Sequence, residues 1–230
     1  MRTILVLNSK GGCGKSTIAT NLAAYYASQG HAVALADFDP QSSSLEWLAA
    51  RPNDRPAIHG IAGFREPVRA PRNTEFLIMD APAAVHGADL TALVRRAQTI
   101  LIPVFPSATD IRAAAHFIKT LLLVGKVERK ETRLATVANR VPRVGTMDTM
   151  LNSVGYESLN LRLFRPLERF LDRLKIPFVA TLPDSPSYAL ADEQGLGIFE
   201  LGDGRAAEDR THWQPLLDWL GSRRSVPRGG

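Results

Sequence analysis

Residues 3–17 read TILVLNSKGGCGKST, a short apolar run that leads into a loop with three glycines and ends in Gly-Lys-Ser-Thr. The run Thr3–Asn8 predicts a buried strand, and the pattern over Ser16–Gln29 predicts a helix that ends at Gly30. A strand, a glycine-rich loop and a helix N-terminus together direct backbone N–H groups at phosphate oxygens. We therefore expect a nucleotide phosphate to bind Gly11, Gly12, Cys13, Gly14, Lys15, Ser16 and Thr17.

Within this loop, two side chains have the positions that nucleotide chemistry needs. Lys15 is expected to contact the β- and γ-phosphates, and the hydroxyl of Ser16 to ligate Mg²⁺. Ser9 stands where the usual GxxxxGK[ST] spacing has its first glycine. We interpret Cys13 as a small residue that fills a tight loop and not as a nucleophile.

Short apolar runs alternate with helical patterns along the rest of the chain, which is typical of a parallel sheet with helices on both faces. The sequence therefore predicts an α/β fold with a doubly wound, mostly parallel sheet flanked by helices, as in P-loop NTPases. The further predicted strands are Ala32–Asp37, Phe76–Asp80, Thr99–Val104, Arg133–Asn139 and Pro177–Thr181.

The predicted helices are less regular than the strands. Ser43–Ala50 and Asp110–Val124 read as helices, the second with Asp110 as its N-cap. Between Thr146 and Lys175 the pattern predicts two helices with a break near Gly155 or Pro166. Arg51–Thr74 reads as a surface loop with at most a short strand near Ile58. We expect one domain over residues 1–221, followed by a flexible basic tail over 222–230.

The bulk properties point to a soluble protein that contacts a polyanion. The 230 residues are 45% hydrophobic, include one cysteine and carry a formal net charge of +5, with a pI near 9.7. A single cysteine allows no internal disulfide and fits a reducing cytosol. The start of the chain has no charged leader, and no apolar run reaches the length of a transmembrane helix, so we expect neither a signal peptide nor a membrane span.

Carboxylates follow two of the predicted strands. Asp37-Phe38-Asp39-Pro40-Gln41 ends one, and four apolar residues precede Asp80 at the end of another. In parallel sheets, ligands bind at the carboxyl ends of the strands, so these carboxylates can position a water or a magnesium-bound water beside the phosphates. Asp80 has the Walker B pattern and is expected to hold a magnesium-bound water.

Lys10, five residues before Lys15, makes the loop resemble the deviant Walker A motif, KGGxGK[ST], of the ParA/MinD family. The segment Asp37–Gln41 also matches the family's DxDPQ motif. The resemblance implies an ATPase in which Lys10 acts on the nucleotide of the partner subunit, Asp39 orients the attacking water and Asp37 supports the metal shell. It further implies adenine recognition by Asn139, Pro183 and Asp184, and ATP and Mg²⁺ as cofactors.

The DPQ motif is typical of the partition branch, and the motif begins so close to Met1 that no N-terminal DNA-binding domain is expected. This branch implies a homodimer with ATP, non-specific binding to nucleoid DNA in the cytoplasm, and slow hydrolysis stimulated by a cargo adaptor that is ParB-like or equivalent. Phosphate contacts need a basic face. The candidate DNA-binding residues are Arg162, Arg165, Arg169, Arg173, Lys175, Arg205, Arg223 and Arg224.

Several alternatives stay open at this point. One is a MinD-like, membrane-switched positioning ATPase, although the pattern from His212 to Leu220 is short, contains Pro215 and favours a helix packed on the domain. Others are a ligase of the dethiobiotin-synthetase kind and a scaffold that binds nucleotide without hydrolysis. An iron-protein-like reductase needs cluster cysteines that the lone Cys13 cannot supply. The cargo is equally open: a plasmid, a chromosome, a carboxysome or a chemoreceptor cluster.

Overall fold

A computed structural model describes residues 1–123, 132–142, 156–202, 204 and 206–227, with the side chains of 156–163 excepted. The strands are β1 (Arg2–Val6), β2 (Val33–Asp37), β3 (Ile58–Ala62), β4 (Phe76–Asp80), β5 (Thr99–Val104), β6 (Arg133–Val141) and β7 (Phe178–Pro183). The helices are α1 (Lys15–Ser28), α2 (Ser43–Ala49), α3 (Gly87–Arg96), α4 (Ala108–Leu123), α5 (Tyr156–Leu174), α6 (Pro186–Glu193) and α7 (Ala207–Gly221).

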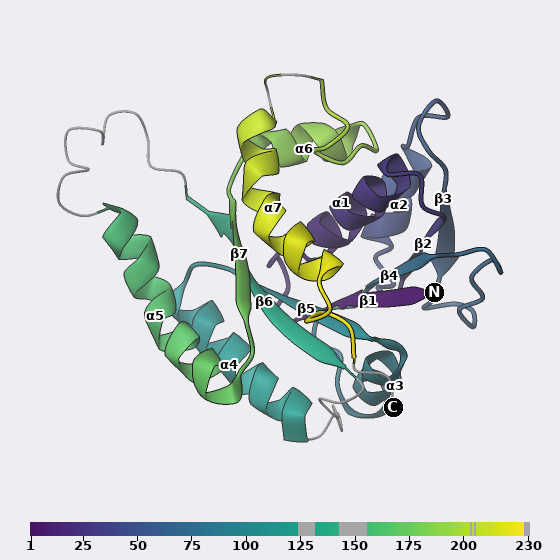
Figure 1. Ribbon diagram of the computed structural model, residues 1–230. Helices are drawn as coiled ribbons and strands as arrows, with labels where there is room; N and C mark the ends of the chain where they lie inside the picture. Colours follow the sequence, from purple (N-terminus) through teal and green to yellow (C-terminus); the bar gives the residue numbers. More distant parts are fainter. Residues whose placement is uncertain (124–131, 143–155, 203, 205, 228–230) are drawn as a thin grey trace.

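The seven strands form one sheet in the order β3-β2-β4-β1-β5-β6-β7, and every neighbouring pair runs parallel (Figure 1). From β1 the chain first builds β2, β3 and β4 on one side and then β5, β6 and β7 on the other. The strand order therefore reverses beside β1, and ligands of such sheets bind at this point, outside the carboxyl ends of the strands. The predicted doubly wound, parallel sheet is confirmed.

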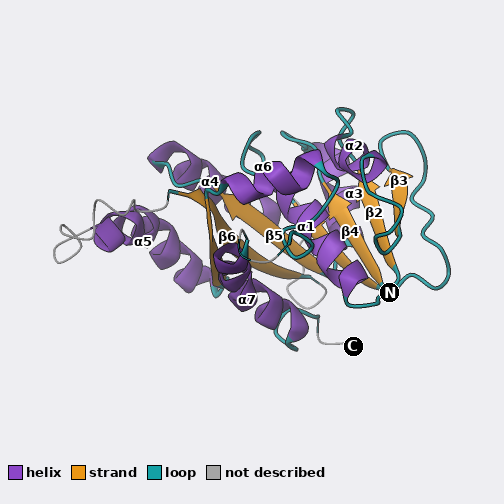
Figure 2. Ribbon diagram, turned by 90° about the horizontal axis from the view of Figure 1, so that it is seen from above, coloured by secondary structure: helices purple, strands orange, loops and turns teal. Residues whose placement is uncertain are grey.

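Helices cover both faces of the sheet and bury it on both sides (Figures 1 and 2). Successive residues of β1 point to opposite faces, so Ile4 and Val6 pack on the side of α1 and α7, whereas Leu5 and Leu7 pack on the side of α3, α4 and α5. Strands that are buried on both faces need apolar residues at nearly every position. This need explains why the strands are visible in the sequence as continuous apolar runs.

Two helices, α3 and α6, were not predicted from the sequence. β3 is the short strand near Ile58 that the sequence allowed within the predicted surface loop. Asp110 is not the N-cap of its helix: α4 begins at Ala108, and the hydroxyl of Ser107 accepts a hydrogen bond from the Asp110 N–H at 3.0 Å. The Ser107 hydroxyl in turn donates to the Asp110 carboxylate, so the cap is Ser107 and Asp110 lies in the first turn.

The sequence pattern predicted a break near Gly155 or Pro166. Helix α5 runs through Pro166 without a break, and Gly155 lies outside the described residues. A proline inside a helix removes one backbone hydrogen bond. Pro166 is exposed, so water can satisfy the carbonyl that loses its partner. The helix begins directly after Gly155, and the first of the two predicted helices falls largely on 143–155, outside the described residues.

The C-terminal segment is packed against the sheet as far as it is described, although a flexible tail was expected from residue 222. Ser225 is completely buried, and its hydroxyl accepts a hydrogen bond from the Arg2 guanidinium at 2.6 Å. The Thr99 hydroxyl donates to the Ser225 carbonyl at 2.6 Å, and Arg133 Nε donates to the Val226 carbonyl at 3.3 Å. These contacts fix 222–227 at the amino ends of β1, β5 and β6, while 228–230 lie outside the described residues.

Helix α7, which contains the aromatic pattern from His212 to Leu220, packs on the sheet face beside β7. Trp213, Leu216 and Leu220 are completely buried, and Trp213 Nε1 donates to the hydroxyl of Tyr188 at 2.9 Å. None of the described helices combines the length and apolar character needed to cross a membrane. The structure therefore uses the apolar side of this helix for the core, as the sequence pattern favoured.

Candidate functional site

The glycine-rich loop connects the carboxyl end of β1 to the N-terminus of α1. Gly12 and Gly14 adopt positive φ angles of 72° and 87°, which turn the chain sharply, and Gly14 is the N-cap of α1. The buried Lys15 side chain curls back into the loop, where Nζ donates to the Lys10 carbonyl at 3.1 Å. A phosphate oxygen can replace this carbonyl, because an anionic acceptor binds an ammonium group more strongly.

The side chain of Asn139 supports the loop from the end of β6. Its Nδ2 donates to the Cys13 carbonyl at 2.9 Å, and a Cβ at Gly14 would lie 2.0 Å from the same nitrogen. No described residue donates to Asn139 Oδ1, so this end of the amide can accept a bond from a ligand. Asn139, predicted as an adenine contact, thus has a second and structural task that the sequence did not indicate.

Asp37 is completely buried and caps α2 with its carboxylate. Oδ1 accepts the Asp39 N–H at 2.9 Å, and Oδ2 accepts the N–H groups of Ser44 at 3.0 Å and Leu45 at 3.3 Å. Burial raises the pKa of Asp37, and the hydrogen bonds from these backbone groups oppose the rise. The structure gives Asp37 a capping role, because both oxygens order the loop that carries Asp39. The metal role implied by the resemblance stays a prediction.

Asp80 is buried beside Asp37, its register partner across β2 and β4. Oδ2 accepts a hydrogen bond from the Ser44 hydroxyl at 2.7 Å, whereas Oδ1 is buried without a partner among the described residues. Burial raises the pKa of Asp80 to about 6, and the hydroxyls of Ser16 and Ser44 lower it in part. A free carboxylate oxygen close to a serine hydroxyl fits a hard cation such as Mg²⁺, which prefers oxygen ligands.

The raised pKa of Asp80 predicts how stability depends on pH in the metal-free protein. The native carboxyl holds its proton up to about pH 6, whereas an unfolded aspartate loses it near pH 4. The protonated Asp80 therefore contributes about 3 kcal/mol to the free energy of unfolding below pH 4. This contribution is lost as the pH rises through 6.

Asp80→Asn removes the titration with little change in shape. In EDTA we expect the variant to be more stable than the parent at pH 7.5 and equally stable at pH 4, measured by urea unfolding. Parallel stability curves for the two proteins across this range would contradict the assignment.

The loop, Asp39 and Asn139 meet in a cleft of about 800 Å³ at the carboxyl edge of the sheet. Asp39 is half-buried, and its Oδ1 accepts the Gln41 N–H at 3.0 Å. Residues of helices α2 and α6 also line the cleft. Of the predicted site residues, the cleft is lined by Gly11, Gly12, Gly14, Lys15, Ser16, Thr17, Asp39, Asn139 and Asp184.

Five of the predicted nucleotide-site residues do not line the cleft, and one of them is the buried Asp80. Cys13 is buried and its Sγ donates to the Lys10 carbonyl, and Asp37 caps α2. Pro183 is buried at the end of β7, one residue before Asp184, which lines the cleft. Lys10 is half-buried beside the loop, and none of the described carboxylates pairs with its ammonium.

Several residues of the site had no signal in the sequence. Ser44 binds Asp80, and Ser185 at the start of α6 donates to the buried Asp209 at 2.8 Å. Behind α2, the buried Arg51 guanidinium binds both carboxylate oxygens of Glu200 at 2.6 and 2.9 Å. Arg51 and Glu200 lie 149 residues apart, and only the folded chain brings them together.

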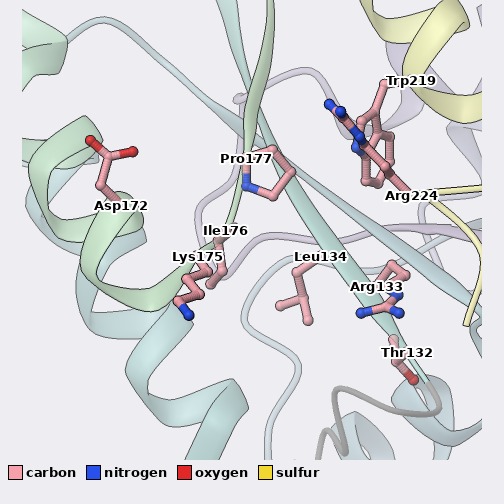
Figure 3. A pocket seen from close by; sticks show the side chains of 9 residues that line it. All are labelled: Thr132, Arg133, Leu134, Asp172, Lys175, Ile176, Pro177, Trp219 and Arg224. Carbon is pink, nitrogen blue, oxygen red and sulfur yellow. The ribbon is translucent and has the colours of Figure 1, made fainter. Parts of the chain in front are cut away.

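The candidate DNA-binding residues lie on another part of the molecule. Arg165, Arg169 and Arg173 are exposed along α5, followed by the exposed Lys175. Figure 3 shows Lys175 and Arg224 around a hollow of about 520 Å³ that Arg133 and Trp219 also line, at the amino ends of β6 and β7. Arg223 and Arg224 are exposed in the turn after α7, whereas the Arg162 side chain and Arg205 lie outside the described residues.

Comparison with known proteins agrees with this arrangement. The maintenance of carboxysome distribution protein A of Halothiobacillus neapolitanus is 29% identical over 90% of this chain and 91% of its own length. In the solved structures, an ATP complex of Cyanothece McdA superposes with a TM-score of 0.70 at 15% identity, covering 96% of this chain and 95% of that one.

The cell division protein MinD of Aquifex aeolicus superposes with a TM-score of 0.67 at 17% identity, covering 99% of this chain and the whole of the other. At these identities the solved structures show the shared fold alone. The family model for the CobQ/CobB/MinD/ParA nucleotide binding domain matches residues 4–198. With its phosphate loop and its sheet, the chain belongs to the CobQ/CobB/MinD/ParA nucleotide-binding family.

Proposed function

We propose that this protein is a ParA-type ATPase that closes as a dimer over ATP, binds DNA non-specifically and positions a cargo in the cell. One observation carries the proposal: the phosphate loop, the half-buried Asp39 and the unpartnered Oδ1 of Asp80 all lie at the same end of the sheet. These are the groups that phosphoryl transfer to water requires.

At this end of the sheet each side chain has a separate task. The N–H groups of Gly12–Ser16 and the Lys15 ammonium bind the phosphate oxygens. Asp39 accepts a hydrogen bond from a water and orients it toward the γ-phosphate. Ser16 and Asp80 would hold Mg²⁺, the second through a water, and the ion neutralises charge on the phosphates when it is bound.

Lys10 supports a reaction that depends on dimerisation. Its ammonium lies outside the cleft of its own chain and pairs with no described carboxylate. We propose that this ammonium reaches a nucleotide bound by a facing subunit. A positive charge supplied in trans stabilises the transition state only in the dimer, so hydrolysis is slow without the correct assembly.

The names of relatives support a protein assembly as the cargo. The relatives from Halothiobacillus neapolitanus and Gloeobacter kilaueensis are both named for the maintenance of carboxysome distribution. We propose a carboxysome or a similar protein compartment, recognised through an adaptor that stimulates hydrolysis. A chromosome origin is the alternative, because a relative from Thermus thermophilus is named as a chromosome-partitioning ATPase.

DNA is the surface on which the proposed dimer is retained. Exposed arginines along α5 and in the turn after α7 provide weak phosphate contacts, and a dimer doubles their number. The membrane alternative has less support, because the apolar residues of α7 are buried against the sheet. These observations favour a nucleoid-associated, cytoplasmic protein.

Retention on a DNA column with ATP, with ADP and without nucleotide tests this proposal. We expect binding with ATP alone, and at least a tenfold loss in an Arg169→Glu/Lys175→Glu variant that still binds ATP. Arg69→Glu/Arg72→Glu makes the same charge change on the exposed loop before β4 and is expected to bind normally. Equal binding with ATP and ADP would contradict the proposed switch.

A further inference from the structure

The turn formed by residues 195–200, just after α6, joins three helices that line the cleft. From α1, the buried Asn21 side chain accepts the Ile198 N–H on its Oδ1 at 2.8 Å. From α2, Trp47 Nε1 donates to the Leu196 carbonyl at 3.1 Å. Residues of α1, α2 and α6 all line the cleft. This largely buried turn therefore fixes how the three helices lie relative to one another.

The guanidinium of Arg51, just after α2, makes the strongest link to this turn. Nη1 and Nη2 donate to the two carboxylate oxygens of Glu200 at 2.9 and 2.6 Å, and Nη1 also donates to the Gly195 carbonyl at 3.1 Å. Nε donates to the Pro56 carbonyl at 3.1 Å, and the Gly197 N–H donates to the Glu200 carboxylate at 2.8 Å. The two charged side chains are only 4% and 3% exposed. Their hydrogen bonds fix the orientation of both.

The turn also meets the neighbouring helices at very short distances. Gly195 has a φ of 62°, and an added Cβ there would lie 2.4 Å from the Arg51 backbone nitrogen. Only a glycine permits so close an approach. On the side of α1, an added Cβ at Gly197 would lie 2.6 Å from the Ala24 Cβ. The turn is therefore packed between α1 and the end of α2, and a shift of either helix displaces it.

The opposite end of α2 carries groups of the proposed reaction. Asp37 caps this end, and its Oδ1 accepts the Asp39 N–H at 2.9 Å. In the first turn of the helix, the Ser44 hydroxyl donates to Asp80 Oδ2 at 2.7 Å. With seven residues, α2 is too short to be stable without tertiary contacts. The direction of α2, and with it the loop that carries Asp39, therefore depends on the contacts of Arg51 at the other end.

An ion pair in the interior contributes geometry more than stability. The hydration that two buried charges lose offsets much of their attraction, and apolar residues of similar volume often stabilise a fold equally well. A guanidinium, however, binds a carboxylate in one plane through two parallel hydrogen bonds, which an apolar contact cannot reproduce. The pair of Arg51 and Glu200 is therefore suited to define an orientation.

We propose that Arg51 and Glu200 are positioning residues for ATP hydrolysis, which hold α2 in the direction that places Asp39 beside the attacking water. This inference rests on the proposed function, because it assumes that ATP is hydrolysed in the cleft. Neither Arg51 nor Glu200 lines the cleft, so their effect is transmitted through α2. The phosphate loop determines ATP affinity, whereas the position of Asp39 determines turnover. Loss of the pair is therefore expected to lower kcat more than ATP affinity.

The double variant Arg51→Met/Glu200→Leu tests this assignment, because it removes both charges and leaves neither buried without a partner. We expect kcat for ATP hydrolysis to fall about tenfold or more. ATP affinity, measured by competition with a fluorescent ATP analogue, should change little, and the urea midpoint should equal or exceed that of the wild type. Arg51→Lys is a second variant, which keeps the charge and loses the planar fork, and its kcat should fall in the same way.

Arg2→Met is the matched control, since Arg2 is another arginine whose guanidinium is held in the fold, at the amino end of β1. It donates to the Ser225 hydroxyl at 2.6 Å, so Arg2→Met should lose stability and keep its kcat. A similar fall of kcat in Arg2→Met would attribute the effect to destabilisation and overturn the assignment. A normal kcat in the double variant, or a loss confined to ATP affinity, would also contradict it. A wild-type chain without ATP turnover would instead contradict the proposed function itself.

Discussion

Replacing Asp39 by alanine is expected to lower ATP turnover by about 10²- to 10⁴-fold while ATP binding is retained. In the cleft, Asp39 Oδ1 accepts the Gln41 N–H, and no described residue donates to its other carboxylate oxygen. That oxygen can orient a water toward the γ-phosphate, and alanine cannot. The phosphate loop does not depend on this side chain, so affinity should change little. Phosphate release and competition binding measure the two quantities separately.

Asp39→Asn provides the matched control for this experiment. The amide oxygen can still accept the hydrogen bond from the Gln41 N–H, so the loop keeps its order while the negative charge is lost. We expect turnover to fall as it does in the alanine variant. If asparagine restored turnover, Asp39 would act by ordering the loop, and the assignment of the attacking water to its carboxylate would be wrong.

The second large effect is expected at Gly14, where alanine should abolish ATP binding and destabilise the fold by about 3 kcal/mol. Gly14 has a φ of 87°, and an added Cβ would lie 2.0 Å from Asn139 Nδ2 and 3.3 Å from its Cγ. Either Asn139 leaves the Cys13 carbonyl or the loop moves. Both changes disturb the N–H groups that bind phosphate.

Gly12→Ala separates the clash from the backbone strain. Gly12 also has a positive φ, of 72°, but nothing lies within 4 Å of an added Cβ. Gly12→Ala should therefore lower the free energy of unfolding by about 1 kcal/mol, the cost of the positive φ alone. In the Gly14→Ala/Asn139→Ala double variant the clash is relieved, so part of the lost stability should return. Equal destabilisation by Gly12→Ala and Gly14→Ala would show that Asn139 does not press on the loop.

The parts of the fold that the sequence predicts best are those buried on both faces. The strand over Phe76–Asp80 is apolar at four of five positions because helices cover both sides of the sheet. Helix α3 was not predicted because it has only three strongly apolar residues, the buried Leu90, Leu93 and Val94. The packing of segment 222–227 was not predicted for a different reason. Hydrogen bonds to Ser225 hold this segment, and a serine gives no hydrophobic signal.

For the site, the sequence predicts what is local and misses what tertiary contacts create. The phosphate loop and the carboxylates after two strands lie within short motifs, and the structure places the loop, Asp39 and Asp80 at one edge of the sheet. The capping role of Asp37 depends on where α2 begins, and Arg51 meets Glu200 only in the folded chain. No pattern of residue types in the sequence predicts either feature.

The molar mass of the Asp39→Ala protein in solution, measured by light scattering with Mg²⁺ and ATP, with ADP or without nucleotide, tests the central claim most directly. With ATP alone we expect a dimer, which has twice the 25.1 kDa mass of one chain. Lys10→Ala in the same background should weaken this dimer, because its cation is proposed to reach the facing nucleotide. A mass that is the same in all three nucleotide states would contradict the proposed switch.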